Sequence, residues 1–141
     1  LGMAYMRPAS SADYPFVHNS WLESCWHNYK HIPNAKQLMS IRISEIMSQS
    51  KIELCVDKED PQVIYGYVVY DSSATHWVYV KFPLRRQGMA TYILGNITPD
   101  ALQFHTFETK AGQHFIEKYD SKLTPFIFER KVLDEAKSKD I

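Results

Sequence analysis

The part of the chain best suited to chemistry is a basic loop that leads from an apolar strand into a short helix. Residues 78–80 read Val-Tyr-Val, and Arg85 and Arg86 follow shortly before Gly88. The first N–H groups of a helix lack partners within it, and the helix dipole favours negative charge there. Gly88 has no Cβ, so a phosphate can approach the backbone closely. The segment therefore predicts an anion site, although its single glycine matches neither a P-loop nor a dinucleotide fingerprint.

This segment resembles the pyrophosphate loop of the GNAT superfamily of N-acetyltransferases. The family pattern is Gln or Arg, two residues, Gly, one residue, then Gly or Ala, and the chain reads Arg85-x-x-Gly88-x-Ala90. The resemblance implies that the loop holds the diphosphate of acetyl-coenzyme A and that the preceding strand edge binds the pantetheine. The residues implied are Arg85, Arg86, Gln87, Gly88, Met89, Ala90 and Thr91 for the diphosphate, and Val78, Tyr79 and Val80 for the pantetheine.

Acyl transfer to an amine also needs a base for the amine and a proton donor for the departing thiolate. His76 begins the strand before the loop and is our first candidate for the base, because an unperturbed histidine pKa of about 6.5 suits the task. His105, on the next predicted strand, is the second candidate. For either ring alone, packing or a structural hydrogen bond is the competing interpretation. The resemblance implies a tyrosine donor where the chain has Ile116, so Tyr119, near the same helix face, is the remaining candidate for the acid.

The predicted elements place these residues in one α/β domain spanning residues 3–141. Runs rich in β-branched and aromatic residues predict strands, and apolar residues at helical spacing predict helices. The strands are expected at 5–8, 51–56, 63–71, 75–81, 102–108 and 125–130, and the helices at 13–29, 35–48, after Gly88, and at 111–119. This order is similar to that of the acetyltransferase fold. The resemblance thus covers residues 5–130 and implies a mostly antiparallel sheet, splayed at the cofactor site and flanked by helices.

Composition narrows the classes of partner. The 141 residues include 16 acidic and 16 basic side chains, which argues against a broad nucleic-acid surface. No apolar run approaches the roughly 18 residues needed to cross a bilayer, so no membrane partner is expected. Cys25 and Cys55 lack zinc-ligand spacing and lie among apolar residues. They predict buried thiols in a reducing compartment, with a disulfide as the alternative, and no metal site.

The sequence therefore predicts a protein that binds acetyl-coenzyme A and moves its acetyl group to a primary amine on a small molecule or a protein. Ile116 leaves a second interpretation open, a non-catalytic binding protein or phage virion-associated protein that keeps the fold. Residues 60–67 and 76–81 also resemble small phage-borne proteins of this fold. We expect a monomer or homodimer in the cytoplasm, which would be the host cytoplasm for a phage protein.

Overall fold

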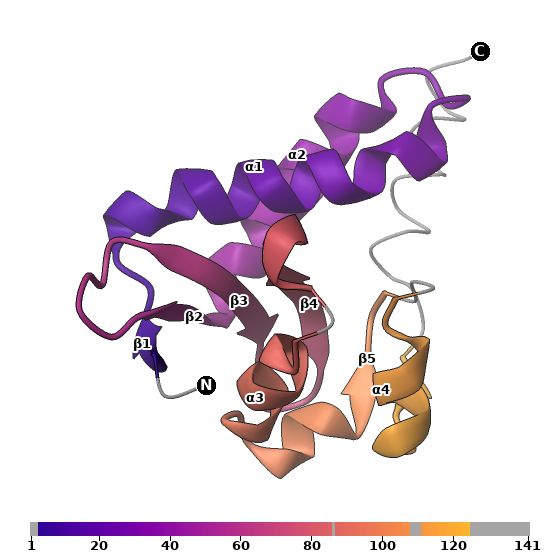
Figure 1. Cartoon of the computed structure of the whole chain (residues 1–141). Helices are drawn as coiled ribbons and strands as arrows, with labels where there is room; N and C mark the ends of the chain where they lie inside the picture. The colour runs from indigo at the N-terminus through magenta and orange to yellow at the C-terminus, as the bar shows by residue number, and fades with distance from the viewer. Residues whose placement is uncertain (1–2, 86, 108–110, 125–141) are drawn as a thin grey trace. The chain divides into compact units, whose positions relative to one another are not determined.

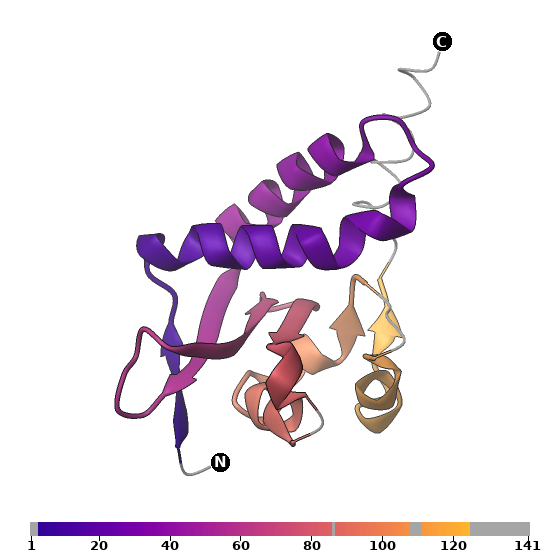
Figure 2. The ribbon, with the colours of Figure 1, turned by 45° about the horizontal axis from the view of Figure 1, so that its top comes forward.

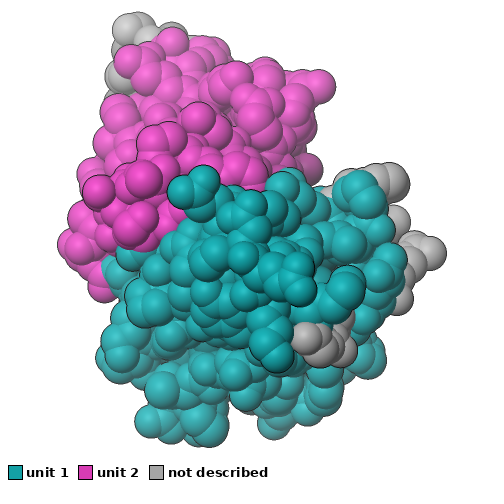
Figure 3. Space-filling model, turned by 60° about the vertical axis from the view of Figure 1, so that its left-hand side comes forward, with its two compact units in different colours: residues 1–9, 50–124 teal, residues 10–49, 125–141 magenta. Residues whose placement is uncertain are grey.

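The computed structural model describes residues 3–85, 87–107 and 111–124 of the chain (Figures 1 and 2). The chain forms two compact units, coloured separately in Figure 3. Unit 1 contains residues 1–9 and 50–124, and unit 2 contains residues 10–49 and 125–141. All the described residues predicted to bind cofactor or to carry out chemistry belong to unit 1. The strand predicted at 125–130 lies outside the described residues.

Unit 1 is built on a mixed sheet of six strands that lie in chain order within the described part of the chain. The first four strands pair antiparallel, β5 runs parallel to β4, and β6 runs parallel to β5. The strands are β1 (Ala4–Pro8), β2 (Lys51–Asp57), β3 (Ile64–Tyr70), β4 (Thr75–Val80), β5 (Phe104–His105) and β6 (Lys122–Leu123). The predicted mixed α/β class is therefore confirmed.

Two aspartates shape the turns of the antiparallel meander. Asp57 Oδ2 accepts hydrogen bonds from the backbone N–H groups of Glu59 and Asp60, both at 3.0 Å, at the end of β2. Asp71 Oδ1 accepts from the N–H groups of Ser73 at 2.8 Å and Ala74 at 3.0 Å, between β3 and β4. Aspartate favours such turns because its short side chain satisfies backbone donors two or three residues on. The polar turns between β2 and β3 and between β3 and β4 therefore have a direct chemical cause.

Strand β5 is much shorter than the predicted range of 102–108. Residues Pro99–Leu102 form a 3-10 helix instead, with Thr98 extended at its N-cap. Proline suits the first turn of a helix because its fixed φ matches and its missing N–H is not needed. Only Phe104–His105 remains as strand, and its pairing with β4 consists of Thr75 opposite His105.

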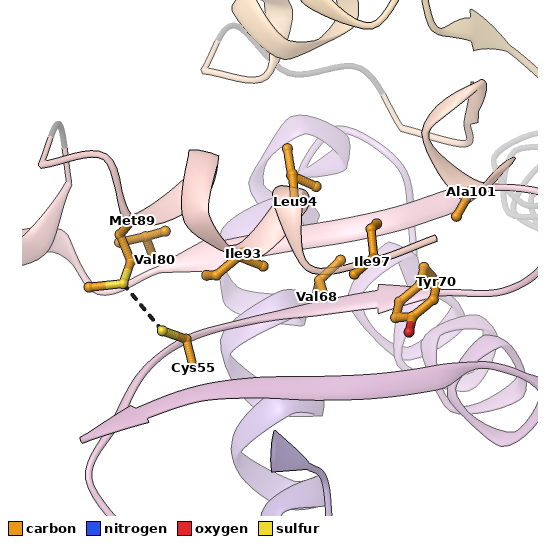
Figure 4. Close-up of a cluster of buried hydrophobic side chains, with 9 residues drawn as sticks. All are labelled: Cys55, Val68, Tyr70, Val80, Met89, Ile93, Leu94, Ile97 and Ala101. Atoms are coloured by element: carbon orange, nitrogen blue, oxygen red, sulfur yellow. Dashed lines mark hydrogen bonds between the residues drawn. The ribbon is translucent and has the colours of Figure 1, made fainter. Parts of the chain in front are cut away.

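The core of unit 1 joins the sheet to α3 (Met89–Gly95), while α4 (Gln113–Lys118) follows later in the chain. Nine buried residues form one hydrophobic cluster (Figure 4): Cys55, Val68, Tyr70, Val80, Met89, Ile93, Leu94, Ile97 and Ala101. Burying a large apolar side chain contributes about 1.5–3 kcal/mol to stability, so this cluster fixes α3 on the sheet. α3 ends at Gly95, in line with the short helix predicted there.

Cys55 belongs to this cluster and is a thiol. Its Sγ lies 3.4 Å from Sδ of Met89. Burial raises the pKa of Cys55 to about 11, so the group stays protonated at neutral pH. Cys25 is buried in unit 2, and the two cysteines do not form a disulfide. The prediction of buried thiols is confirmed.

Unit 2 is a pair of helices that pack on each other, α1 (Tyr14–Cys25) and α2 (Ala35–Gln49). α1 is preceded by a turn in which Asp13 Oδ2 accepts the N–H of Ser10 at 2.8 Å. The helix predicted to reach residue 29 ends as α-helix at Cys25 and continues as a 3-10 helix over Trp26–Tyr29. Among the described residues, no helix is both long and apolar enough to cross a bilayer.

Gly66 of β3 provides a test of this packing. A Cβ placed on Gly66 would lie 2.4 Å from the carbonyl oxygen of Tyr79 and 3.0 Å from Cδ1 of Ile93. We expect Gly66→Ala to lower the free energy of unfolding by about 1–3 kcal/mol, since neither the backbone nor a buried side chain can yield cheaply. Urea denaturation measures the change.

Gly95→Ala is the matched control, because a Cβ there meets nothing within 4 Å. It should leave the free energy of unfolding unchanged or raise it by at most about 1 kcal/mol. Equal effects of the two substitutions would contradict the close approach of β3 and β4 at Gly66.

Candidate functional site

The outer edge of β4 is largely unpaired. The N–H of Thr106 donates to the carbonyl oxygen of Thr75 at 3.2 Å, and beyond that point no described strand pairs with β4 on this side. Lys81 N–H donates to Tyr65 of β3 at 2.9 Å, so alternate residues of β4 turn their backbone groups toward β3. Val78 and Val80 then face the outer edge. An extended ligand could add to this edge as a further strand does.

Tyr79, the middle residue of the predicted pantetheine edge, faces the other way along its backbone. It pairs with Tyr67 of β3, and the two rings stack with centroids 5.2 Å apart. Its carbonyl oxygen points at β3, as its closeness to Gly66 shows. Of the three strand residues assigned from the resemblance, Val78 and Val80 are thus the two whose backbone groups face the outer edge, and the carbonyl oxygen of Val80 there accepts a hydrogen bond from Arg85.

The loop after β4 turns through a short 3-10 helix, Phe82–Leu84, before α3. Arg85 folds back, so that its Nε donates to the carbonyl oxygen of Val80 at 2.9 Å. Its guanidinium lies over the ring of Tyr79, 5.9 Å from the centroid. Gln87 Nε2 donates to the carbonyl oxygen of Pro83 at 3.3 Å. Arg86 lies outside the described residues.

Gly88 occupies the N-cap of α3 with φ +80°, a left-handed conformation that side chains rarely adopt. A Cβ built on it meets nothing within 4 Å, so this side of the turn is open. Met89, the next residue, points into the core, and Ala90 is half-buried. Thr91 is exposed. The predicted glycine turn therefore exists, and of these loop residues it is Met89 whose side chain is committed to packing.

His76 lies at an irregularity of β4 and is held from both sides. Pairing with β3 shifts between Trp77 and Thr75, so His76 is the extra residue of a β-bulge. Its Nε2 lies 2.8 Å from Oδ2 of Asp71, and its Nδ1 lies 2.9 Å from Oγ1 of Thr106. The His76 side chain is 11% exposed and that of Asp71 is 31% exposed. Three polar side chains thus form one continuous chain of hydrogen bonds.

The carboxylate of Asp71 determines which nitrogen of His76 carries the proton. Burial acts to raise the pKa of Asp71, but hydrogen bonds from His76 and Ser73 outweigh it and lower the pKa to about 2. An ionised carboxylate only accepts hydrogen bonds, so Nε2 must be the donor. In the neutral ring, Nδ1 is then an acceptor and faces the hydroxyl of Thr106. The basic lone pair of His76 therefore lies against Thr106.

His105, the second candidate base, is buried and is not joined to His76. Its Nδ1 lies 2.8 Å from Oγ of Ser121. Its carbonyl oxygen accepts the N–H of Thr124 at 3.0 Å, next to β6. The competing interpretation for His105, that its ring makes a structural hydrogen bond, thus has a partner in Ser121. Thr106, which directly follows β5, is the residue that reaches His76, whereas the ring of His105 bonds to Ser121.

The candidate acid is placed less favourably for proton transfer. Tyr119 caps the C-terminal end of α4 and packs, half-buried, against the core cluster of unit 1. The ammonium of Lys118 lies 5.4 Å from its ring centroid. Ile116 is also half-buried. Tyr119 is therefore a packing residue at the rim of the core in this structure.

Sequence reasoning missed Asp71 and Thr106 as partners of His76. In the sequence Asp71 is typical of a turn residue, and in the structure it does form a turn by accepting hydrogen bonds from the N–H groups of Ser73 and Ala74. Thr106 carried no signal, because only the pairing of β4 with β5 brings it to His76.

An open depression of about 380 Å³ adjoins the Asp71 turn, lined by Ser72, Ser73, Asp100, Gln103, Phe104 and Thr124. Among the described residues, no group of three His, Cys, Asp or Glu could hold a metal ion.

The lowered pKa of Asp71 predicts a pH dependence of stability. The folded pKa is about 2 and the ordinary value is 3.8, so the stabilising contribution is complete above about pH 4 and is lost as the pH falls toward 2. We expect Asp71→Asn to lower the free energy of unfolding by about 1–2 kcal/mol at pH 6, with the gap to wild type closing by pH 2. Urea denaturation across this range measures the gap. A gap that stays constant between pH 6 and pH 2 would contradict the assignment.

Comparison with known proteins adds no assignment. No protein-family model matches the chain, and no curated protein matches it. Three local features of unit 1 bear on function: the outer edge of β4, the open Gly88 turn, and the hydrogen-bond chain through His76.

Proposed function

We propose that the protein binds acetyl-coenzyme A and transfers the acetyl group to a primary amine. The observation that carries the proposal is the short parallel pairing of β4 with β5, which among the described residues consists of Thr75 opposite His105, together with the Gly88 turn that follows β4 after the Phe82–Leu84 helix. An open strand edge beside a helix-opening glycine offers backbone donors and acceptors to an extended amide chain and to its terminal diphosphate. The bound cofactor would supply the acetyl group as a thioester.

The edge residues fit an amide-containing arm. The backbone of Val78 faces outward and is not paired by a described strand on that side. The carbonyl oxygen of Val80 already receives Nε of Arg85 at 2.9 Å. Arg85 is thus held close to the strand end, where its guanidinium can turn toward an anion. A hydrogen bond to a charged group contributes about 1.5–3 kcal/mol.

The turn fits a diphosphate in its chemistry and its space. Gly88 leaves room on the side where a side chain would project, and the exposed hydroxyl of Thr91 lies within the first turn of α3. Backbone N–H groups at the start of a helix suit anionic oxygens. The proposal assigns the N–H groups of residues 86–90 to this role, together with the side chains of Arg85 and Arg86.

His76 is the base in this proposal. Its Nδ1 faces the hydroxyl of Thr106, so a proton from the amine would reach the ring through or in place of that hydroxyl, and Asp71 would stabilise the imidazolium that forms. The proposed acceptor is a primary amine of a small molecule or a protein. The proposed location of the protein is the cytoplasm. Tyr119, which packs against the core cluster, is the proposed acid.

One observation favours the non-catalytic alternative. Ile116 has no proton to donate, and Tyr119 packs against the core cluster. A protein of this fold that binds the cofactor without turnover, such as a phage virion-associated protein, would need no acid. Titration with acetyl-coenzyme A followed by thiol release across a panel of amines separates the two: binding without release favours the alternative.

Gly88→Glu tests cofactor binding. The side chain would occupy the open side of the turn and repel a diphosphate, so we expect calorimetric titration to show loss of acetyl-coenzyme A binding. Gly88→Asn is the control for backbone strain, because Asn tolerates a left-handed conformation and adds no charge. Gly95→Glu controls for added charge at the other end of α3. Normal binding by Gly88→Glu would refute the loop assignment.

His76→Ala tests the base. It removes the proton acceptor but touches neither the Gly88 turn nor the outward backbone of Val78. We expect turnover to fall about 10²-fold or more while the affinity for acetyl-coenzyme A changes little. Steady-state thiol release and calorimetry measure the two quantities separately. Unchanged turnover would assign the base elsewhere.

A further inference from the structure

The chain Asp71–His76–Thr106 has the arrangement of an activated nucleophile. A hydroxyl lies 2.9 Å from one ring nitrogen, and a carboxylate lies 2.8 Å from the other. A nucleophile and a base within hydrogen-bond reach, with the base oriented by a third group, is the pattern shared by unrelated hydrolases and acyltransferases. The nitrogens are used in the opposite sense from the serine proteases, since Nδ1 rather than Nε2 faces the hydroxyl.

Each of the three side chains is held in place by its own contacts. Asp71 accepts three hydrogen bonds through Oδ1, from the N–H and hydroxyl of Ser73 and the N–H of Ala74. This leaves Oδ2 for His76 alone among the described contacts. The backbone N–H of Thr106 is bonded to Thr75, which fixes where its side chain lies. Pre-positioned groups of this kind lower the entropic cost of reaching a reactive geometry.

The direction of the hydrogen bonds favours activation of the hydroxyl. Since Nε2 donates to the carboxylate, the neutral ring can only accept at Nδ1, and the hydroxyl of Thr106 is the donor. Thr106 is half-buried, so it is sheltered and yet still partly accessible. No other acceptor for that hydroxyl is found among the described residues. Its proton is therefore already directed at the base.

We propose that Asp71, His76 and Thr106 form a nucleophilic triad in which Thr106 takes an acyl group from an activated ester. Oγ1 of Thr106 forms a bond to the acyl carbon while the bond from that carbon to the leaving oxygen breaks. The Oγ1 proton passes to Nδ1 of His76 and then to the leaving group or solvent. Water completes the cycle by the reverse sequence and frees the acid. This activity needs no coenzyme A, and it uses the same nitrogen of His76 as the function proposed above.

The test uses p-nitrophenyl acetate with the full chain and no cofactor. We expect release of nitrophenolate above the rate of the ester in buffer, with an initial burst if the acyl-threonine accumulates. Acid quenching during the burst, proteolysis and mass spectrometry should locate an added acetyl group on Thr106. Because coenzyme A is absent, failure here leaves the cofactor proposal untouched, and failure of the Gly88 test leaves this one untouched.

Matched variants make the result decisive. Thr106→Val keeps the shape of the side chain without its hydroxyl and should slow release about 10²-fold or more, whereas Thr106→Ser should retain it. Thr98→Val is the control, because Thr98 is an exposed threonine whose side chain makes no cap hydrogen bond. Release at the wild-type rate by Thr106→Val overturns the proposal. If that variant does not fold, mass spectrometry of the acetylated wild-type protein decides the question. Acetyl groups found on other side chains and not on Thr106 overturn the triad.

Discussion

Everything of functional interest in unit 1 follows from the unequal pairing of β4. On one side the strand pairs with β3, apart from the bulge at His76, and on the other its pairing with β5 consists, among the described residues, of Thr75 opposite His105. The connection before β5 coils as a 3-10 helix over Pro99–Leu102, so the strand begins at Phe104 rather than at Leu102. A strand fixed along one edge and unpaired along most of the other is rigid yet still able to bind along its backbone.

The core holds the rest of the site to that strand. Met89 and Ile93 of α3 are buried in the cluster that includes Val80 of β4 (Figure 4). The first helical turn after Gly88 is thereby fixed close to the strand end. Gly66 allows β3 to lie against the carbonyl of Tyr79 with no side chain between them. Packing therefore sets the distance between the strand edge and the glycine turn, which are the two parts a long cofactor would have to meet at once.

Local patterns in the sequence predicted most elements because their causes are local. Runs rich in β-branched and aromatic residues predict β3 and β4, and Gly88 suits the left-handed opening of α3. The length of β5 was wrong because residues 102–108 alternate as a strand does, yet the preceding proline turn decides where the strand begins. The orientation of the Tyr79 backbone depends on which alternate residues of β4 face β3. Strand pairing decides this, so the sequence of β4 alone could not predict it.

The partners of His76 were beyond sequence reasoning for the same reason. Residues 71 and 76 are separated by a turn, and residue 106 directly follows β5, so the chain of hydrogen bonds exists only once β4 and β5 are in register. The sequence position of His76 was enough to select it as a candidate base. It could not predict which ring nitrogen carries the proton or which residue each nitrogen faces. A single histidine on a strand carries no information about which nitrogen will be free.

This arrangement constrains any reaction at the site. Nε2 of His76 is committed to Asp71, so Nδ1 is the one basic atom of the ring, and Thr106 already occupies it. An attacking amine must either displace the hydroxyl of Thr106 or pass its proton through that hydroxyl. Both the proposed amine transfer and the proposed acylation of Thr106 therefore draw on the same lone pair. Thr106, rather than His76 itself, is the group that a substrate would meet first.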